Sequence, residues 1–310
     1  MTTSRAKPAQ RLVPTFLDQG LALAWGGWVE LGVSGWTATH QDWAIDPEPL
    51  IVFTAFLADA DPRLRDEATD WCIRNWRHVS KTRLKNLVAG QPAEGQGAFG
   101  ALSATVSTHA GVAWPNQTEA RPFTVTGRST APRLAQPSMV WLRLRAMFGL
   151  GARAEILRYF LTTDAAPRAS VAAIANAIQY TKRNVADECD ALADAGMLAV
   201  RTVRNRYVYS LAKRAELESL VGPLPPIRPS SATILDVARE LIEMEEQATS
   251  SAVRTLPVTA RKVLDRIEVH LDELGIEPPT ATGSDLWPAM QRLGTDTLGA
   301  WSLGRWHRSV

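Results

Sequence analysis

Between residues 152 and 211 the spacing of apolar side chains changes in an order that few folds can accommodate. Apolar residues recur at helical intervals over 152–161, over 171–178 and again after Thr181. They then alternate with polar residues in two short runs, 197–203 and 206–211, as they do in strands. The sequence therefore predicts two helices, a tight turn, a third helix and a β-hairpin, in that order.

Short polar residues mark the predicted ends of these elements. Ser170 and Thr181 are predicted N-caps, because their hydroxyl oxygens can accept hydrogen bonds from the free N–H groups of a first helical turn. Arg204 and Asn205 are expected to join the two strands of the hairpin. The helix after Thr181 should bury three residues at intervals of four and three, namely Val185, Cys189 and Leu192.

Residues 145–211 resemble the winged helix-turn-helix of ArsR/MarR-type bacterial regulators. Four segments carry the resemblance, in the order of the family's first helix, second helix, start of the recognition helix and helix-to-wing junction: 148–157, 171–175, 180–185 and 192–198. Gln179 stands where the family often has glycine in the turn between its second and third helices.

The resemblance implies that this part of the chain binds double-stranded DNA. The first turn of a recognition helix enters the major groove, and the wing is suited to phosphates or to a narrow minor groove. The helix would contribute Thr181, Lys182, Arg183 and Asn184, with Thr181 either touching DNA or capping the helix so that its N-terminus meets a phosphate. The wing would contribute Arg201, Arg204, Asn205 and Arg206.

Charge supports a polyanionic partner for the same stretch. Residues 141–215 contain 12 basic and 6 acidic side chains, whereas residues 216–310 contain 9 and 14. Against this, Asp187, Asp190 and Asp194 share the outward face of the recognition helix with Arg183, and Asp187 could hold Arg183 in an i, i+4 pair. The alternative is that these charges are merely solvated and that the unit is a protein-interaction module.

Helical patterns flank this unit, which we place at 138–215. Residues 11–112 form a Trp-rich helical region, and residues 113–137 form an extended connector with room for a short strand at 123–125. A Pro-rich linker is expected at 221–230, followed by a helical region at 231–306. Residues 1–10 form an expected disordered lead-in. The predicted fold class is thus mainly α, with a central winged helix-turn-helix between two helical regions.

Predicted N-caps and tryptophans give further detail on the N-terminal region. Asp46 and Asp61 each precede a proline, a pattern typical of an N-cap and first helical residue, and Ser80 is a third predicted cap. Seven of the 11 tryptophans lie before residue 115. They are expected to form the core of this region, with base stacking as the alternative.

Two apolar stripes mark the C-terminal region. Their members are Ile234, Val237, Leu241 and Met244 in one helix, and Val263, Leu264, Ile267, Leu271 and Leu274 in the next. Because a helical hairpin leaves apolar surface on its outer side, these stripes must meet either a second subunit or the rest of the chain. We expect a homodimer with 230–306 in its interface, and packing on the N-terminal helices is the alternative.

The sequence lacks the residue patterns that are typical of other function classes. The five histidines and two cysteines are scattered, so we expect no metal site, and we find no catalytic or cofactor-binding arrangement. The segment 95–100 matches G-x-G-x-x-G but lacks a preceding buried strand. No apolar run is long enough for a membrane span, so we expect no membrane partner and a cytoplasmic location.

These observations predict a DNA-binding bacterial transcriptional regulator, most simply a repressor, and not an enzyme. The alternative is a protein-interaction component of a toxin–antitoxin or defence operon, such as an antitoxin that also regulates its own promoter. Its partner would bind through the helical regions.

Overall fold

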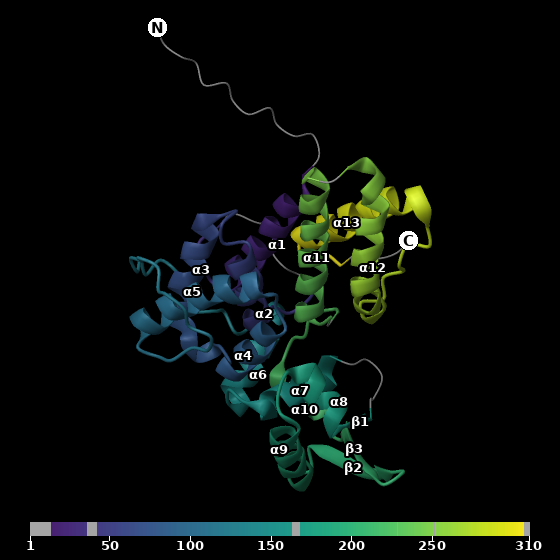
Figure 1. Ribbon diagram of the computed structural model, residues 1–310. Helices are drawn as coiled ribbons and strands as arrows, with labels where there is room; N and C mark the ends of the chain where they lie inside the picture. Colours follow the sequence, from purple (N-terminus) through teal and green to yellow (C-terminus); the bar gives the residue numbers. More distant parts are fainter. Residues whose placement is uncertain (1–13, 36–41, 163–167, 228, 251, 307–310) are drawn as a thin grey trace.

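The computed structural model describes residues 14–35, 42–162, 168–227, 229–250 and 252–306 (Figure 1). This part of the chain is mainly helical, with thirteen α-helices and one three-stranded antiparallel sheet. Figure 1 shows a larger helical part built from both ends of the chain and a smaller part that carries the sheet. The lead-in expected at 1–10 lies outside the described residues.

Five α-helices lie before residue 112: α1 (Phe16–Glu30), α2 (Pro47–Phe56), α3 (Pro62–Asn75), α4 (Lys81–Ala89) and α5 (Ala93–Ala110). Two of the three predicted caps are confirmed. Asp61 accepts hydrogen bonds from the N–H groups of Arg63 and Leu64, and Ser80 accepts one from that of Arg83. Asp46 lies at the N-cap position of α2 but makes no such bond, because its carboxylate is used elsewhere.

Tryptophans contribute to the core of this part. Trp28 and Trp71 are fully buried and meet edge to face, with ring centroids 5.4 Å apart. Both indole N–H groups are satisfied: Trp28 donates to Thr54 Oγ1 at 2.8 Å and Trp71 to the Leu31 carbonyl at 2.7 Å. These two rings are therefore inaccessible to nucleic-acid bases.

The connector after α5 contains no helix until the 3₁₀ turn Pro137–Met139 (η2). No strand forms at 123–125, so that part of the sequence expectation is wrong. The backbone that follows is held by a side chain instead of a neighbouring strand. Asp70 accepts hydrogen bonds from the N–H groups of Thr126 and Gly127 and from the Ser129 hydroxyl, at 2.5–2.8 Å.

The smaller part begins with α6 (Val140–Phe148) and α7 (Ala152–Thr162) and continues through β1 (Ala169–Ser170), α8 (Val171–Ile178), α9 (Lys182–Asp194), β2 (Leu198–Val203) and β3 (Arg206–Leu211). The strand order is β1-β3-β2, and Val203 pairs with Arg206 next to the two-residue hairpin turn. These elements bury a hydrophobic core of their own. An additional helix, α10 (Arg214–Val221), closes that core with Leu217 and Val221, where the sequence analysis expected no element.

The C-terminal helices α11 (Ser231–Ser250), α12 (Leu256–Glu273) and α13 (Leu286–Ser302) pack on the N-terminal ones. The helix α1 contacts α13 and α11, and α2 contacts α11. All nine residues of the two apolar stripes are buried in the core that these regions share. The stripes therefore meet the chain's own helices, which removes the sequence argument for a dimer interface there; the homodimer itself stays a prediction.

Close packing between α13 and α1 gives a direct test of this shared core. A Cβ at Gly294 would overlap the buried ring of Phe16. We expect Gly294→Leu to lower the free energy of unfolding by about 1–3 kcal/mol through overpacking, measured by urea denaturation.

The control is Gly97→Leu in α5, where a Cβ meets nothing within 4 Å. Because leucine is a better helix former than glycine, this variant should stabilise the chain by about 0.5–1 kcal/mol. Equal effects of the two variants would contradict close packing at Gly294.

Candidate nucleic-acid interface

The turn between α8 and α9 sets the direction of α9. Gln179 has a left-handed backbone, with φ of 61°, which glycine adopts at lower cost. Thr181 then caps α9, since its hydroxyl oxygen accepts a hydrogen bond from the N–H of Asn184 at 3.4 Å. Both the predicted cap and the predicted buried face of α9 are confirmed, the latter comprising Val185, Cys189 and Leu192.

The first turn of α9 is open to solvent. Thr181, Lys182, Arg183 and Asn184 are all exposed. The hydroxyl oxygen of Thr181 is used by the cap, which leaves the positive end of the helix facing outward. This turn therefore presents two cationic side chains, one amide side chain and free backbone N–H groups.

The hairpin of β2 and β3 presents the second set of predicted residues. Arg204 and Asn205 have φ of 46° and 60°, the paired positive values of a tight hairpin turn. They and Arg201 and Arg206 are exposed. Figure 1 shows this hairpin beside α9 in the smaller part of the molecule, and β2 contacts α9.

The acidic residues on α9 do not neutralise these cations. Among the described residues, Arg183 forms no ion pair, with Asp187 or any other carboxylate. Asp190 accepts a hydrogen bond from the phenol of Tyr209 at 2.7 Å, which joins α9 to β3. Burial raises the pKa of Tyr209, and the neighbouring Asp190 raises it further, so the phenol keeps the proton that it donates.

Two hydrogen bonds that the sequence did not predict tie the α8–α9 turn to α4. The Asn86 side chain donates to the carbonyl of Gln179 at 2.7 Å, and the hydroxyls of Ser80 and Tyr180 lie 2.9 Å apart. The larger helical part thus contacts the segment that orients α9.

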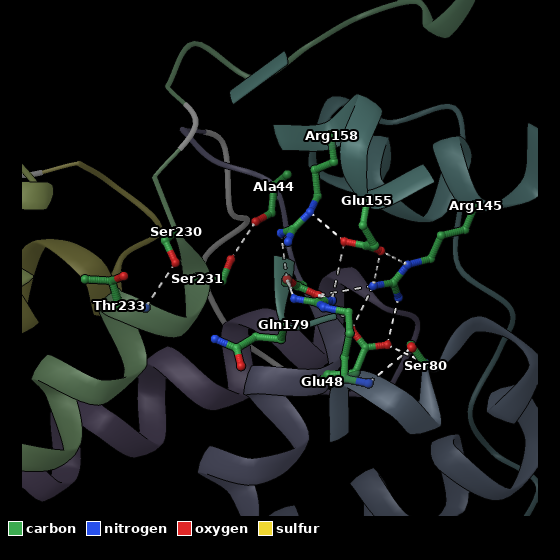
Figure 2. Close-up of polar contacts among 12 residues, drawn as sticks. Ala44, Glu48, Ser80, Arg145, Glu155, Arg158, Gln179, Ser230, Ser231 and Thr233 are labelled. Carbon is green, nitrogen blue, oxygen red and sulfur yellow. Dashed lines mark hydrogen bonds and ion pairs between the residues drawn. The ribbon is translucent and has the colours of Figure 1, made fainter. Parts of the chain in front are cut away.

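Behind this contact lies a buried cluster of three carboxylates and three guanidinium groups (Figure 2). We call it the ionic cluster; its members are Asp46, Glu48, Arg83, Arg145, Glu155 and Arg158. Five of these side chains are at most 2% exposed, and that of Arg158 is 12% exposed. Three members come from α2 and α4 or their start, and three come from α6 and α7, so the ionic cluster joins the two parts of the molecule.

Arg145 occupies the middle of the ionic cluster. It donates to both oxygens of Glu48, at 2.9 and 2.8 Å, to Glu155 at 2.8 Å and to the His78 carbonyl at 2.9 Å. Arg83 binds both oxygens of Asp46 at 2.6 Å and also contacts Glu48. Most of the buried charge is therefore directly hydrogen-bonded.

The arginines of the ionic cluster lower the pKa of two of its carboxylates, whereas at Glu48 burial outweighs them and raises the pKa. Burial alone would raise the pKa of Asp46, but Arg83 and Arg158 outweigh it and hold this pKa well below its usual range. Arg145 and Arg158 likewise outweigh burial at Glu155 and lower its pKa. Asp46 and Glu155 are thus ionised at neutral pH, because close guanidinium groups favour the charged form.

No family model, no curated protein and no solved structure matches this chain. The segment 95–100, with its G-x-G-x-x-G spacing, lies inside α5, so its backbone forms a helix and not a phosphate-binding loop. Over the described ranges, no group of three or more His, Cys, Asp or Glu could hold a metal ion, and no helix is both long and apolar enough to cross a membrane.

Proposed function

We propose that the chain is a DNA-binding transcriptional regulator in which the smaller part acts as a winged helix-turn-helix. One observation carries the proposal. The first turn of α9 and the hairpin of the same part present five exposed cations, none of them ion-paired with a described residue: Lys182, Arg183, Arg201, Arg204 and Arg206. The element order and the β1-β3-β2 sheet also suit this module.

The chemistry of these side chains suggests a division of labour. Arg183 and Asn184 on α9 match the acceptors and donors of base edges in the major groove. The N-terminus of α9 favours a phosphate, because its N–H groups carry partial positive charge. The arginines of the hairpin would bind backbone phosphates or a narrow minor groove.

A titration of the purified chain against duplex DNA from its own upstream region tests the proposal. Fluorescence anisotropy should give an affinity that falls as salt rises, with a slope of log K against log salt of about −0.9 per phosphate contact. A folded chain that binds neither this duplex nor an unrelated one at ~50 mM salt would disprove it.

Substitutions on α9 should separate base contacts from phosphate contacts. We expect Arg183→Ala and Asn184→Ala each to cost about 1–3 kcal/mol of binding to the specific duplex and little on unrelated DNA, because these side chains would contact base edges. Anisotropy on both duplexes measures the difference. Asp194→Asn, at the far end of the same helix, is the control that should leave the preference unchanged. An equal loss on both duplexes for Arg183→Ala would show that Arg183 binds phosphate instead.

A further inference from the structure

A cavity of about 270 Å³, lined by several charged side chains, lies where the two parts of the molecule meet. Its walls come from α4, the α8–α9 turn, α11 and α12. One water takes up roughly 30 Å³ of liquid, and small-molecule sites begin at roughly 300 Å³. The cavity is far larger than a single water requires and lies just below this range, so its size suits only the smallest metabolites.

One wall of the cavity is the contact that orients α9. Asn86 and Gln179 both line it, and they are joined by the 2.7 Å hydrogen bond from the amide of Asn86 to the carbonyl of Gln179. Gln179 carries the left-handed turn between α8 and α9. A molecule bound here would directly contact the α8–α9 turn of the proposed DNA-binding module.

The carboxylates and guanidinium groups that line the cavity are equal in number. Asp236 and Glu240 are negative, and Arg239 and Arg266 are positive. Glu240 is already bound by Arg266, whose Nε donates to it at 2.7 Å, which leaves the terminal nitrogens of Arg266 to bind a carboxylate. Among the described residues Asp236 forms no ion pair; burial raises its pKa, which Arg239, His270 and a hydrogen bond from the Gln91 side chain lower in part. The lining thus offers one carboxylate outside any ion pair and one partly free guanidinium.

We propose that this cavity binds a zwitterion of amino-acid size, with its ammonium group on Asp236 and its carboxylate on Arg266, and that binding changes DNA affinity through Gln179. A ligand of single charge would upset the balance of the lining, whereas a zwitterion has one group for each sign. The regulatory half of this inference rests on the proposed DNA-binding function; the binding half does not.

The test uses the full chain and the standard L-amino acids as probes, one at a time, in calorimetric titrations without DNA. At least one should bind saturably, while acetate and methylammonium, which carry one charge each, should not. Asp236→Asn should weaken that binding at least tenfold, and it should fold, because burial already disfavours the charge that it removes. The matched control is Asp265→Asn on the exposed face of α12, 59% exposed, which should bind as the parent chain does.

The same amino acid is then added to the DNA titration. Saturating ligand should change DNA affinity by at least about fivefold in the parent chain and not in Asp236→Asn. Absence of binding by every probe, or unchanged binding in Asp236→Asn, would overturn the ligand site even if the chain binds DNA. Binding without any change in DNA affinity would overturn the coupling. If the chain binds no DNA at all, the proposed function fails, and the calorimetric result still decides the site.

Discussion

Replacing Arg145 by methionine should lower the free energy of unfolding by about 3–5 kcal/mol, the largest loss that we expect from any single substitution. The substitution leaves Glu48 and Glu155 buried with fewer cationic partners. It also removes the hydrogen-bond donor of the His78 carbonyl. The ionic cluster would then hold three carboxylates and two guanidinium groups in a site that water does not reach. Urea denaturation at neutral pH, followed by circular dichroism, measures the loss.

The control for this prediction is an arginine in an exposed pair. Arg261 and Asp265 are i, i+4 neighbours on α12, 47% and 59% exposed. Arg261→Met should change stability by at most about 1 kcal/mol, since solvent screens such pairs. If Arg145→Met cost no more than this control, the ionic cluster would contribute no stability beyond that of a surface pair.

The position of the ionic cluster links stability to function. It joins the start of α2 and α4 to α6 and α7, and so fixes one hydrophobic core against the other. The contacts of α4 with Gln179 and Tyr180 lie next to it. Weakening the cluster should therefore also loosen the placement of α9 relative to the larger helical part.

Local chemistry made much of the smaller part predictable. Thr181 caps α9 through a bond to a residue three positions away, and the buried face of α9 follows from helical spacing alone. The exposure of the eight predicted residues follows from the same spacing and from the hairpin turn. Each of these features depends on residues that are close in sequence.

The remaining features depend on pairings between distant residues. Asp46 looked like a helix cap because it precedes Pro47, yet its partners Arg83 and Arg158 lie 37 and 112 positions away. Nothing near Asp46 in the sequence indicates them. Likewise, the stripe on α12 shows that this face is buried but not which surface buries it, so we expected a second subunit where the chain's own helices pack.

Removing the hairpin's charge should have the largest effect on DNA binding. If Arg201, Arg204 and Arg206 each contact one phosphate, replacing all three by glutamine should make the slope of log K against log salt less negative by about 2.7. At ~0.1 M monovalent salt this corresponds to roughly 500-fold weaker binding, and the difference should shrink toward 1 M. The loss should be alike on the specific duplex and on unrelated DNA, because phosphates carry no base sequence. Anisotropy titrations over a range of salt concentrations measure both quantities.

A second triple variant separates local contacts from the overall charge of the chain. Replacing Arg254, Arg261 and Arg292 by glutamine removes the same charge from exposed positions in the C-terminal helical region. At ~0.15 M salt, charges more than about 8 Å from the DNA are largely screened, so this variant should keep the parent slope and nearly the parent affinity. Equal losses for the two triple variants would mean that the net charge, and not the hairpin, attracts DNA. A loss on the specific duplex alone would mean that the hairpin contacts bases or a narrow minor groove, since base edges and DNA shape, and not phosphates, distinguish the two duplexes.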